Sequence, residues 1–196
     1  MTAEPTRRNL FAGLLAAGAG TIAGGVLAGA VPDLADSAPS PRLDQRILAF
    51  ALLLEEVQAG FYAEALRRAR LRGELLTFAR TVAAQEDAHR RYLRKALGSA
   101  AGPAPKLDFG DDTADPERFA RSALRLEDLA VKAYFTQAAH LTPAALAAAT
   151  RIATVESRHA AWIRDLTGND PAPDPVEPTL SAATVRTTLQ GSGYVR

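Results

Sequence analysis

The chain has 196 residues, with 23 Lys and Arg, 22 Asp and Glu, three His and no Cys, and its formal net charge is +1 at pH 7. This length is typical of one domain with extensions. The charge is balanced and shows no acidic or basic block, so no nucleic-acid partner is expected. The lack of cysteine excludes disulfides, thiolate metal sites, iron–sulfur clusters and a lipidated cysteine anchor.

Residues 1–38 have the features of an export signal and a linker. Arg7-Arg8 lies in a stretch that resembles a twin-arginine motif, and no charged residue follows until Asp33. The uncharged segment is rich in Gly and Ala, which favours the twin-arginine translocase over the general secretion route. Ala28-Gly29-Ala30 fits a small-x-small cleavage site. An uncleaved membrane anchor is the alternative, because the segment is long enough to span a bilayer. Export to the periplasm, the cell envelope or the medium is expected.

Two helices are predicted next, over about residues 43–71 and 75–97. Ser40-Pro41 supplies an N-cap and a proline at the first helical position. Gly73 is the candidate C-cap of the first helix, and the short turn makes the two helices antiparallel neighbours. The outer face of the second helix is basic, which favours a solvated face over an anion-binding or membrane-surface patch. Its basic residues are Arg90, Arg91, Arg94 and Lys95.

Residues 98–116 form the longest internal connection. At about 3.3 Å per extended residue this segment reaches about 60 Å, whereas the second helix is about 35 Å long. The connection can therefore cross the bundle and start the third helix parallel to the second. The third helix is expected from Asp115-Pro116 to about His140, a helix-end residue rather than a ligand, and the fourth from Thr142-Pro143 to Gly168. The proline-rich tail, 169–196, has room for one short helix over about 180–189.

One pattern of a glutamate, a tyrosine and a later Glu-x-x-His occurs twice, and it contains two of the three histidines. In a helix, residues three apart lie on one face, so Glu86 and His89 can bind one ion together. Residues seven apart, such as Glu55 and Tyr62, lie two turns along the same stripe. Four such helices offer the ligand set of a dinuclear carboxylate site. The predicted metal ligands are Glu55, Glu86, His89, Glu127, Glu156 and His159, and the tyrosines are Tyr62 and Tyr134.

Carboxylate and imidazole ligands suit iron, manganese and zinc, and the excess of carboxylates favours iron or manganese. Glu56 and Asp128 each follow a predicted ligand by one residue and would replace it if the register were shifted. The shared spacing to tyrosine favours Glu55 and Glu127 instead.

These stretches resemble the ferritin-like superfamily, and most closely the bacterial ferritin-like-domain proteins that include desiccation-related proteins. The resemblance covers about residues 43–167 and rests on the segments 54–62 and 126–134 and on both Glu-x-x-His motifs. It implies an all-α fold, a ferritin-like four-helix bundle at residues 39–168 in which a long crossover joins two antiparallel helical hairpins. It also implies two iron or manganese ions with one histidine each.

In that superfamily arrangement, Glu55 and Glu127 would be terminal ligands, and Glu86 and Glu156 would bridge the ions. Tyr62 and Tyr134 would donate hydrogen bonds to carboxylates across the core. The alternative for the tyrosines is a purely structural role in the core, with satisfied hydroxyls.

The expected function is an exported redox protein that oxidises ferrous ion, consumes peroxide or protects against oxidative stress. Its partners would then be metal ions and dioxygen or peroxide, and the sequence allows a homo-oligomer. One alternative is a non-enzymatic stress or cell-envelope binding protein on the same scaffold. The other is a dimetal enzyme that acts on an organic substrate.

Overall fold

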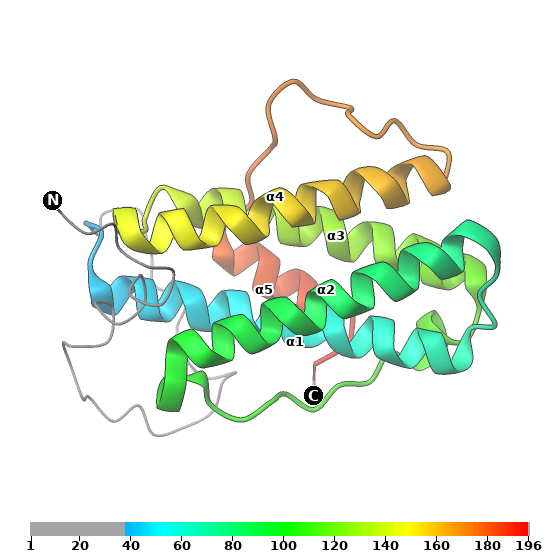
Figure 1. Cartoon of the computed structure of the whole chain (residues 1–196), viewed down its shortest axis with the longest axis horizontal. Coiled ribbons are helices and arrows are strands. Elements are labelled where there is room, and N and C mark those ends of the chain that lie inside the picture. The colour runs from blue at the N-terminus through cyan, green and yellow to red at the C-terminus, as the bar shows by residue number, and fades with distance from the viewer. Residues whose placement is uncertain (1–37, 196) are drawn as a thin grey trace, which may run out of the picture.

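The computed structural model describes residues 38–195, and this part of the chain is all-α. Four long helices lie side by side along one axis, and a fifth, shorter helix lies beside them (Figure 1). The fold is the predicted four-helix bundle. The helices are α1 (Pro41–Arg68), α2 (Gly73–Leu97), α3 (Pro116–Ala138), α4 (Pro143–Leu166) and α5 (Ala182–Gly191), with short 3-10 turns at Gly98–Ala101 and Gly110–Thr113.

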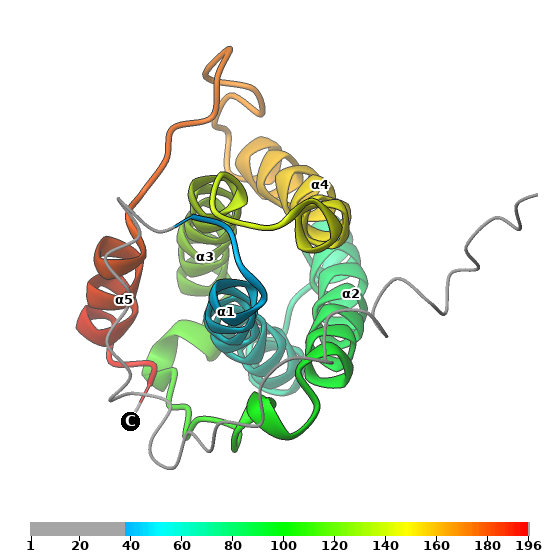
Figure 2. The same ribbon diagram turned by 90° about the vertical axis from the view of Figure 1, so that its left-hand side faces the viewer.

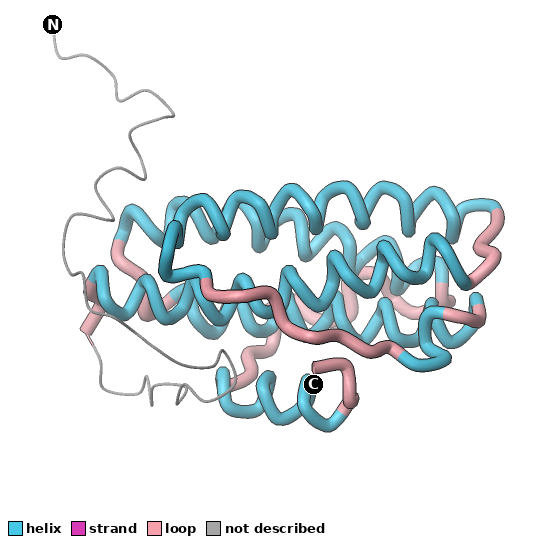
Figure 3. The backbone as a smooth tube through the Cα atoms, turned by 90° about the horizontal axis from the view of Figure 1, so that it is seen from below, coloured by secondary structure: helices cyan, strands magenta, loops and turns pink. Residues whose placement is uncertain are grey.

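The order of the helices is that of two antiparallel hairpins, α1 with α2 and α3 with α4 (Figure 2). The segment between α2 and α3 runs back along the whole bundle (Figure 3), so α3 starts at the end where α2 started. It passes close to α1 at Gly60, where a Cβ atom would lie 2.6 Å from the Leu107 side chain. The predicted long crossover is therefore confirmed, and a larger residue at position 60 would require the Leu107 side chain to shift.

The helix starts follow the predicted caps. The Ser40 side chain accepts a hydrogen bond from the Leu43 amide, and Asp115 accepts from two amides at the start of α3. The prediction that Gly73 caps the end of α1 is wrong. The helix ends at Arg68, and Arg70 takes the left-handed conformation at φ 44° where the chain turns. Gly73, at φ 55°, is instead the first residue of α2.

The start of α1 is tied to the turn between α3 and α4 by one buried carboxylate. Both oxygens of Asp44 accept hydrogen bonds from Thr142, one from its amide at 2.9 Å and one from its hydroxyl at 2.6 Å. Asp44 is fully buried. The contact fixes the register between the two hairpins at one end of the bundle, because it joins residues at the start of α1 and the start of α4.

The C-terminal segment packs on the α1–α3 side of the bundle (Figure 2). Val185 and Leu189 of α5 belong to the same apolar core as Phe61. Tyr194 stacks near Phe61 and Phe109, and its carbonyl accepts a hydrogen bond from the Asp108 amide of the crossover. The tail therefore holds the crossover against the bundle.

The predicted export motif, cleavage site and membrane anchor fall on residues 1–37, outside the described part of the chain. Within the described residues, every helix is either too short or too polar to cross a bilayer. Three of the four basic residues on the outer face of α2 form ion pairs, with two carboxylates between them. Arg90 and Arg91 pair with Asp87, and Arg94 pairs with Glu56.

Candidate metal centre

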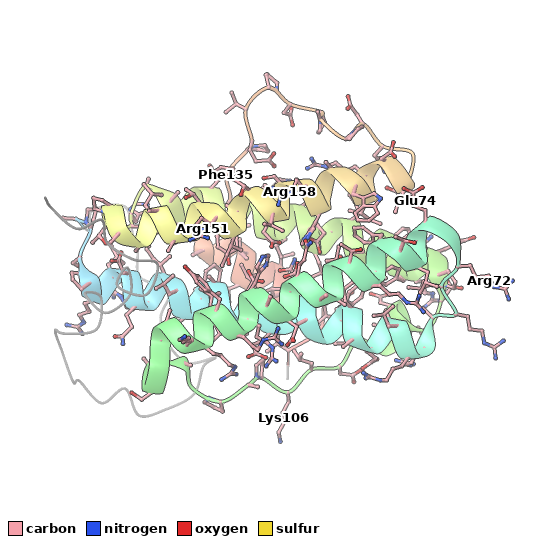
Figure 4. All side chains as sticks on the ribbon, in the orientation of Figure 1. Arg72, Glu74, Lys106, Phe135, Arg151 and Arg158 are labelled. Carbon is pink, nitrogen blue, oxygen red and sulfur yellow. The ribbon has the colours of Figure 1, made fainter. Side chains whose placement is uncertain are left out.

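Charged side chains such as Arg72, between α1 and α2, and Lys106, in the crossover, point away from the bundle (Figure 4). The bundle interior, in contrast, contains a cluster of buried titratable side chains. The four glutamates of the cluster are fully buried, and each long helix contributes at least one of its residues. The structure brings all six predicted ligands together in two groups. One group is Glu55, Glu86, His89 and Glu156, and the other is Glu86, Glu127, Glu156 and His159.

Each group is centred on one histidine nitrogen. The Nδ1 atom of His89 lies 3.0 Å from Glu156 Oε1, 3.4 Å from Glu55 Oε2 and 3.6 Å from Glu86 Oε2. The i, i+3 spacing of Glu86 and His89 on α2 accounts for one of these contacts. The other two are made by residues of α1 and α4, so the group exists only when the hairpins are assembled.

The second group repeats this arrangement around His159. Its Nδ1 atom lies 3.0 Å from Glu86 Oε1, 3.4 Å from Glu127 Oε2 and 4.0 Å from Glu156 Oε1. Glu86 thus directs one oxygen toward each histidine, and the ring centres of the two histidines are 6.3 Å apart. A carboxylate that faces both nitrogens in this way can bridge two ions.

The two tyrosines connect the halves of the repeat. Tyr134 on α3 donates to Glu55 Oε1 at 2.5 Å, and Tyr62 on α1 donates to Glu127 Oε1 at 2.5 Å. Each tyrosine therefore holds the terminal glutamate of the other half. In each of these glutamates the other oxygen, Oε2, has no hydrogen-bond partner.

Two glutamines that the sequence analysis did not identify also contact the cluster. The Gln58 amide Nε2 donates to Glu127 Oε1 at 3.1 Å and to Glu156 Oε2 at 3.3 Å. Gln85 Oε1 lies 2.6 Å from His159 Nε2, and a carbonyl oxygen can only accept, so Nε2 carries the proton and Nδ1 is directed at the carboxylates. A signal for Gln58 was present, since a polar residue three after Glu55 lies on the same helix face.

Glu56 and Asp128 do not take part in the cluster. Glu56 pairs with Arg94 at 2.5 Å, and Asp128 pairs with Arg164 at 2.7 Å. Their helix positions point them about 100° away from the predicted ligands. The register shift considered from the sequence is therefore not adopted.

Burial shifts the protonation of the cluster. Burial, with the charge of Glu86, raises the pKa of Glu55 to about 8, and burial, with the charge of Glu55, raises the pKa of Glu156 to about 7. Burial alone would lower the pKa of both histidines, but the close carboxylates outweigh it and raise the pKa of His89 to about 12 and of His159 to about 10. Without a cation the cluster therefore retains protons near neutral pH.

Most of the buried polar atoms of the described chain that lack a hydrogen-bond partner belong to this cluster. They include Oε2 of Glu55 and Glu127, both oxygens of Glu86, Oε1 of Glu156, and Nδ1 of His89 and His159. Unpartnered buried polar atoms are costly unless something satisfies them. All of these atoms are metal donors, so the residues present fit a bound metal cation.

An apolar cavity of about 10 Å³ lies between the first half of α1 and the end of α3, and Tyr134 is part of its wall. This volume is that of about one water-sized molecule. Tyr134 is therefore shared between the cavity wall and the hydrogen bond to Glu55.

Comparison with protein families gives a match, and comparison with curated proteins gives none. The family model described as ferritin-like domain covers residues 43–169. This range includes α1 from its third residue, α2 to α4, the crossover and all six residues of the cluster. The chain therefore belongs to the ferritin-like domain family.

Proposed function

We propose that this protein is an exported dimetal-carboxylate redox protein. The observation that carries the proposal is the pair of donor groups that share Glu86 and Glu156, with their unpartnered atoms directed into a buried interior. Two such groups side by side suit two ions. The excess of carboxylates over imidazoles favours iron or manganese.

Each residue of the cluster has a definable part in this proposal. His89 and Glu55 would hold one ion, and His159 and Glu127 would hold the other, with Glu86 between them. Tyr62 and Tyr134 fix the two terminal carboxylates, so that their free oxygens stay in place. When bound, a pair of iron or manganese ions supplies one-electron chemistry between ferrous ion and dioxygen or peroxide.

The surroundings of the cluster favour small reactants. The glutamates are fully buried, so water is excluded from most of the site.

Export by the twin-arginine route, through Arg7-Arg8, is part of the proposal. Ligands from four helices come together only in the folded bundle, so folding and metal binding are coupled. Because this route carries folded proteins, the metal ions could be inserted in the cytoplasm, where the cell controls which metals are available, before the protein is exported. Outside, the ordinary affinity order would favour copper or zinc.

The test is elemental analysis of the purified full chain, followed by assays of ferrous oxidation and peroxide consumption. Two iron or manganese ions per chain and activity in either assay support the proposal. The matched control is the Glu86→Ala, Glu156→Ala double variant, which should bind no metal and be inactive. A wild-type protein that binds no metal overturns the proposal and favours the alternative, a non-enzymatic stress or cell-envelope binding protein on the same scaffold. A protein that binds two ions per chain but neither oxidises ferrous ion nor consumes peroxide overturns the redox part of the proposal.

A further inference from the structure

We propose that the metal centre is reached from the side of the bundle where α2 and α4 meet, beside His89, and that Arg151 and Arg158 make this entry favour small anions over metal cations. This inference rests on the proposed function, because it assumes that the cluster holds metal ions. It adds the charge of the reactant, which the proposed function leaves open. A small anion, superoxide among the reduced oxygen species, is favoured at this entry, and free ferrous ion is disfavoured.

The cluster comes closest to solvent at His89. Its side chain is 12% exposed, whereas that of His159 is 3% exposed and the four glutamates are fully buried. His89 lies on α2 and is directed at Glu156 on α4. The shortest way from solvent to the ligands therefore leads past this imidazole, between α2 and α4.

The contacts between α2 and α4 define the register of the two helices. His89 lies 3.0 Å from Glu156, and Gln85, about one turn earlier on α2, lies 2.6 Å from His159, further along α4. The two helices are therefore antiparallel where they meet. The half-buried Val155 precedes His159 by one turn and shares its α2-facing side, so it is about level with His89.

Two arginines lie on the same side of α4 as Val155. Arg151 precedes it by four residues and Arg158 follows it by three, so the three side chains form one stripe. At about 1.5 Å per residue, the arginines lie about 6 Å and about 5 Å from the level of His89 along the helix axis. Burial raises the pKa of Tyr92 on α2, and the charge of Arg151 opposes this rise, so Arg151 lies close to α2.

The charges of Arg151 and Arg158 are not compensated by acidic neighbours. Both side chains are exposed on α4 (Figure 4), and neither forms an ion pair with any described residue. Outside the cluster, the acidic residue of α4 is Asp165, about two turns beyond Arg158. On α2, both oxygens of Asp87 are already held by two arginines of the same helix. The described surface around the entry is therefore positively charged.

Once metal is bound, this surface dominates the charge that a further reactant meets. Two divalent ions carry a charge of +4 and the four glutamates carry −4, so together they are neutral. At about 7 Å in water, one unit charge changes the local concentration of a monovalent ion about threefold, so two arginines enrich an anion about tenfold at low salt. A divalent cation is depleted more strongly, because its interaction energy with each arginine is twice as large.

The experiment compares the wild type with an Arg151→Gln, Arg158→Gln variant. The first readout is the rate of Mn²⁺ uptake by the metal-free full chain, measured by stopped flow with a fluorescent indicator of free Mn²⁺. The loss of two positive charges should speed uptake at least about tenfold at low ionic strength. In about 0.5 M NaCl, where the Debye length is about 4 Å, the difference should largely disappear.

The second readout is the affinity of the metal-loaded chain for azide, a small monovalent anion that binds to metal ions. Binding is followed by absorption for iron or by electron paramagnetic resonance for manganese, and the variant should bind azide about tenfold more weakly at low ionic strength. Arg151→Lys with Arg158→Lys keeps both charges and should match the wild type in both readouts. The matched control, Arg42→Gln with Arg46→Gln, removes two exposed charges at the start of α1 and should change neither readout.

A Mn²⁺ uptake rate or an azide affinity that does not change in the Arg151→Gln, Arg158→Gln variant overturns the inference and leaves the proposed function intact. An equal effect of the Arg42→Gln, Arg46→Gln control also overturns it, because the response would then depend on net charge rather than on this entry. A wild-type protein that binds neither iron nor manganese overturns the proposed function, and the inference with it.

Discussion

Removal of Glu86 and Glu156 should abolish the stabilisation of the protein by metal. Both donor groups contain these two residues, so the Glu86→Ala, Glu156→Ala variant leaves each position with one glutamate and one histidine. Alanine is the best helix former, so α2 and α4 should persist. The two substitutions leave cavities, which destabilise the folded protein, but they also remove buried carboxylates that repel one another, and the two effects offset each other.

The expected magnitude follows from linkage. A ligand at 100 times its dissociation constant stabilises the folded state by about 2.7 kcal/mol, so two ions contribute about 5 kcal/mol. For a chain of this length, 1 kcal/mol shifts the melting temperature by about 2–4 °C. Saturating Mn²⁺ should therefore raise the melting temperature of the wild-type protein by about 10–20 °C relative to a chelator, and that of the variant by about none.

The assay is thermal unfolding of both proteins followed by circular dichroism, in chelator and in Mn²⁺. The control is the Glu56→Gln, Asp128→Asn variant, which changes the neighbouring carboxylates that pair with Arg94 and Arg164. Its absolute stability should fall, while its shift with Mn²⁺ should match that of the wild type. A full shift in the Glu86, Glu156 variant would refute the ligand assignment, and so would a lost shift in the control.

Three further outcomes are expected. Folding raises the pKa of Glu55 and Glu156 from the ordinary 4.5 to about 8 and about 7, so the folded metal-free protein binds more protons than the unfolded chain. The stability that these two groups contribute is fully present below about pH 4.5 and is lost as pH rises through these values. The melting temperature should therefore fall between about pH 5 and about pH 9, and a rise would contradict the buried charge cluster. Asp44→Ala should lower the free energy of unfolding in urea by about 2–4 kcal/mol, and Asp44→Asn by about half as much, since one acceptor remains for the Thr142 amide; equal losses would show that the hydrogen bond from the Thr142 amide contributes nothing. Arg7→Lys with Arg8→Lys should leave the protein folded and metal-bound in the cytoplasm, measured by fractionation with metal analysis, and unchanged export would exclude the twin-arginine route.

The sequence by itself determined the helices, their order and the faces that meet inside the bundle. Helix periodicity places Glu86 and His89 on one face, and the same rule places Glu55 two turns from Tyr62. The 98–116 connection is long enough to run back along the whole bundle, and the structure has that crossover. These are local or length-dependent properties, so they can be obtained without knowing which residues touch.

Tertiary structure alone decided which residues are partners. Tyr62 lies on the same stripe as Glu55 but donates to Glu127, because a hydroxyl that extends across the core meets the facing helix rather than its own. The turn conformation at Arg70, and with it the position of Gly73, depends on how α1 and α2 meet. Gln58 looks like any other polar helix residue until α3 and α4 enclose it. Only then does its buried amide have two carboxylate oxygens within reach, and a buried donor is stable only where it has such acceptors.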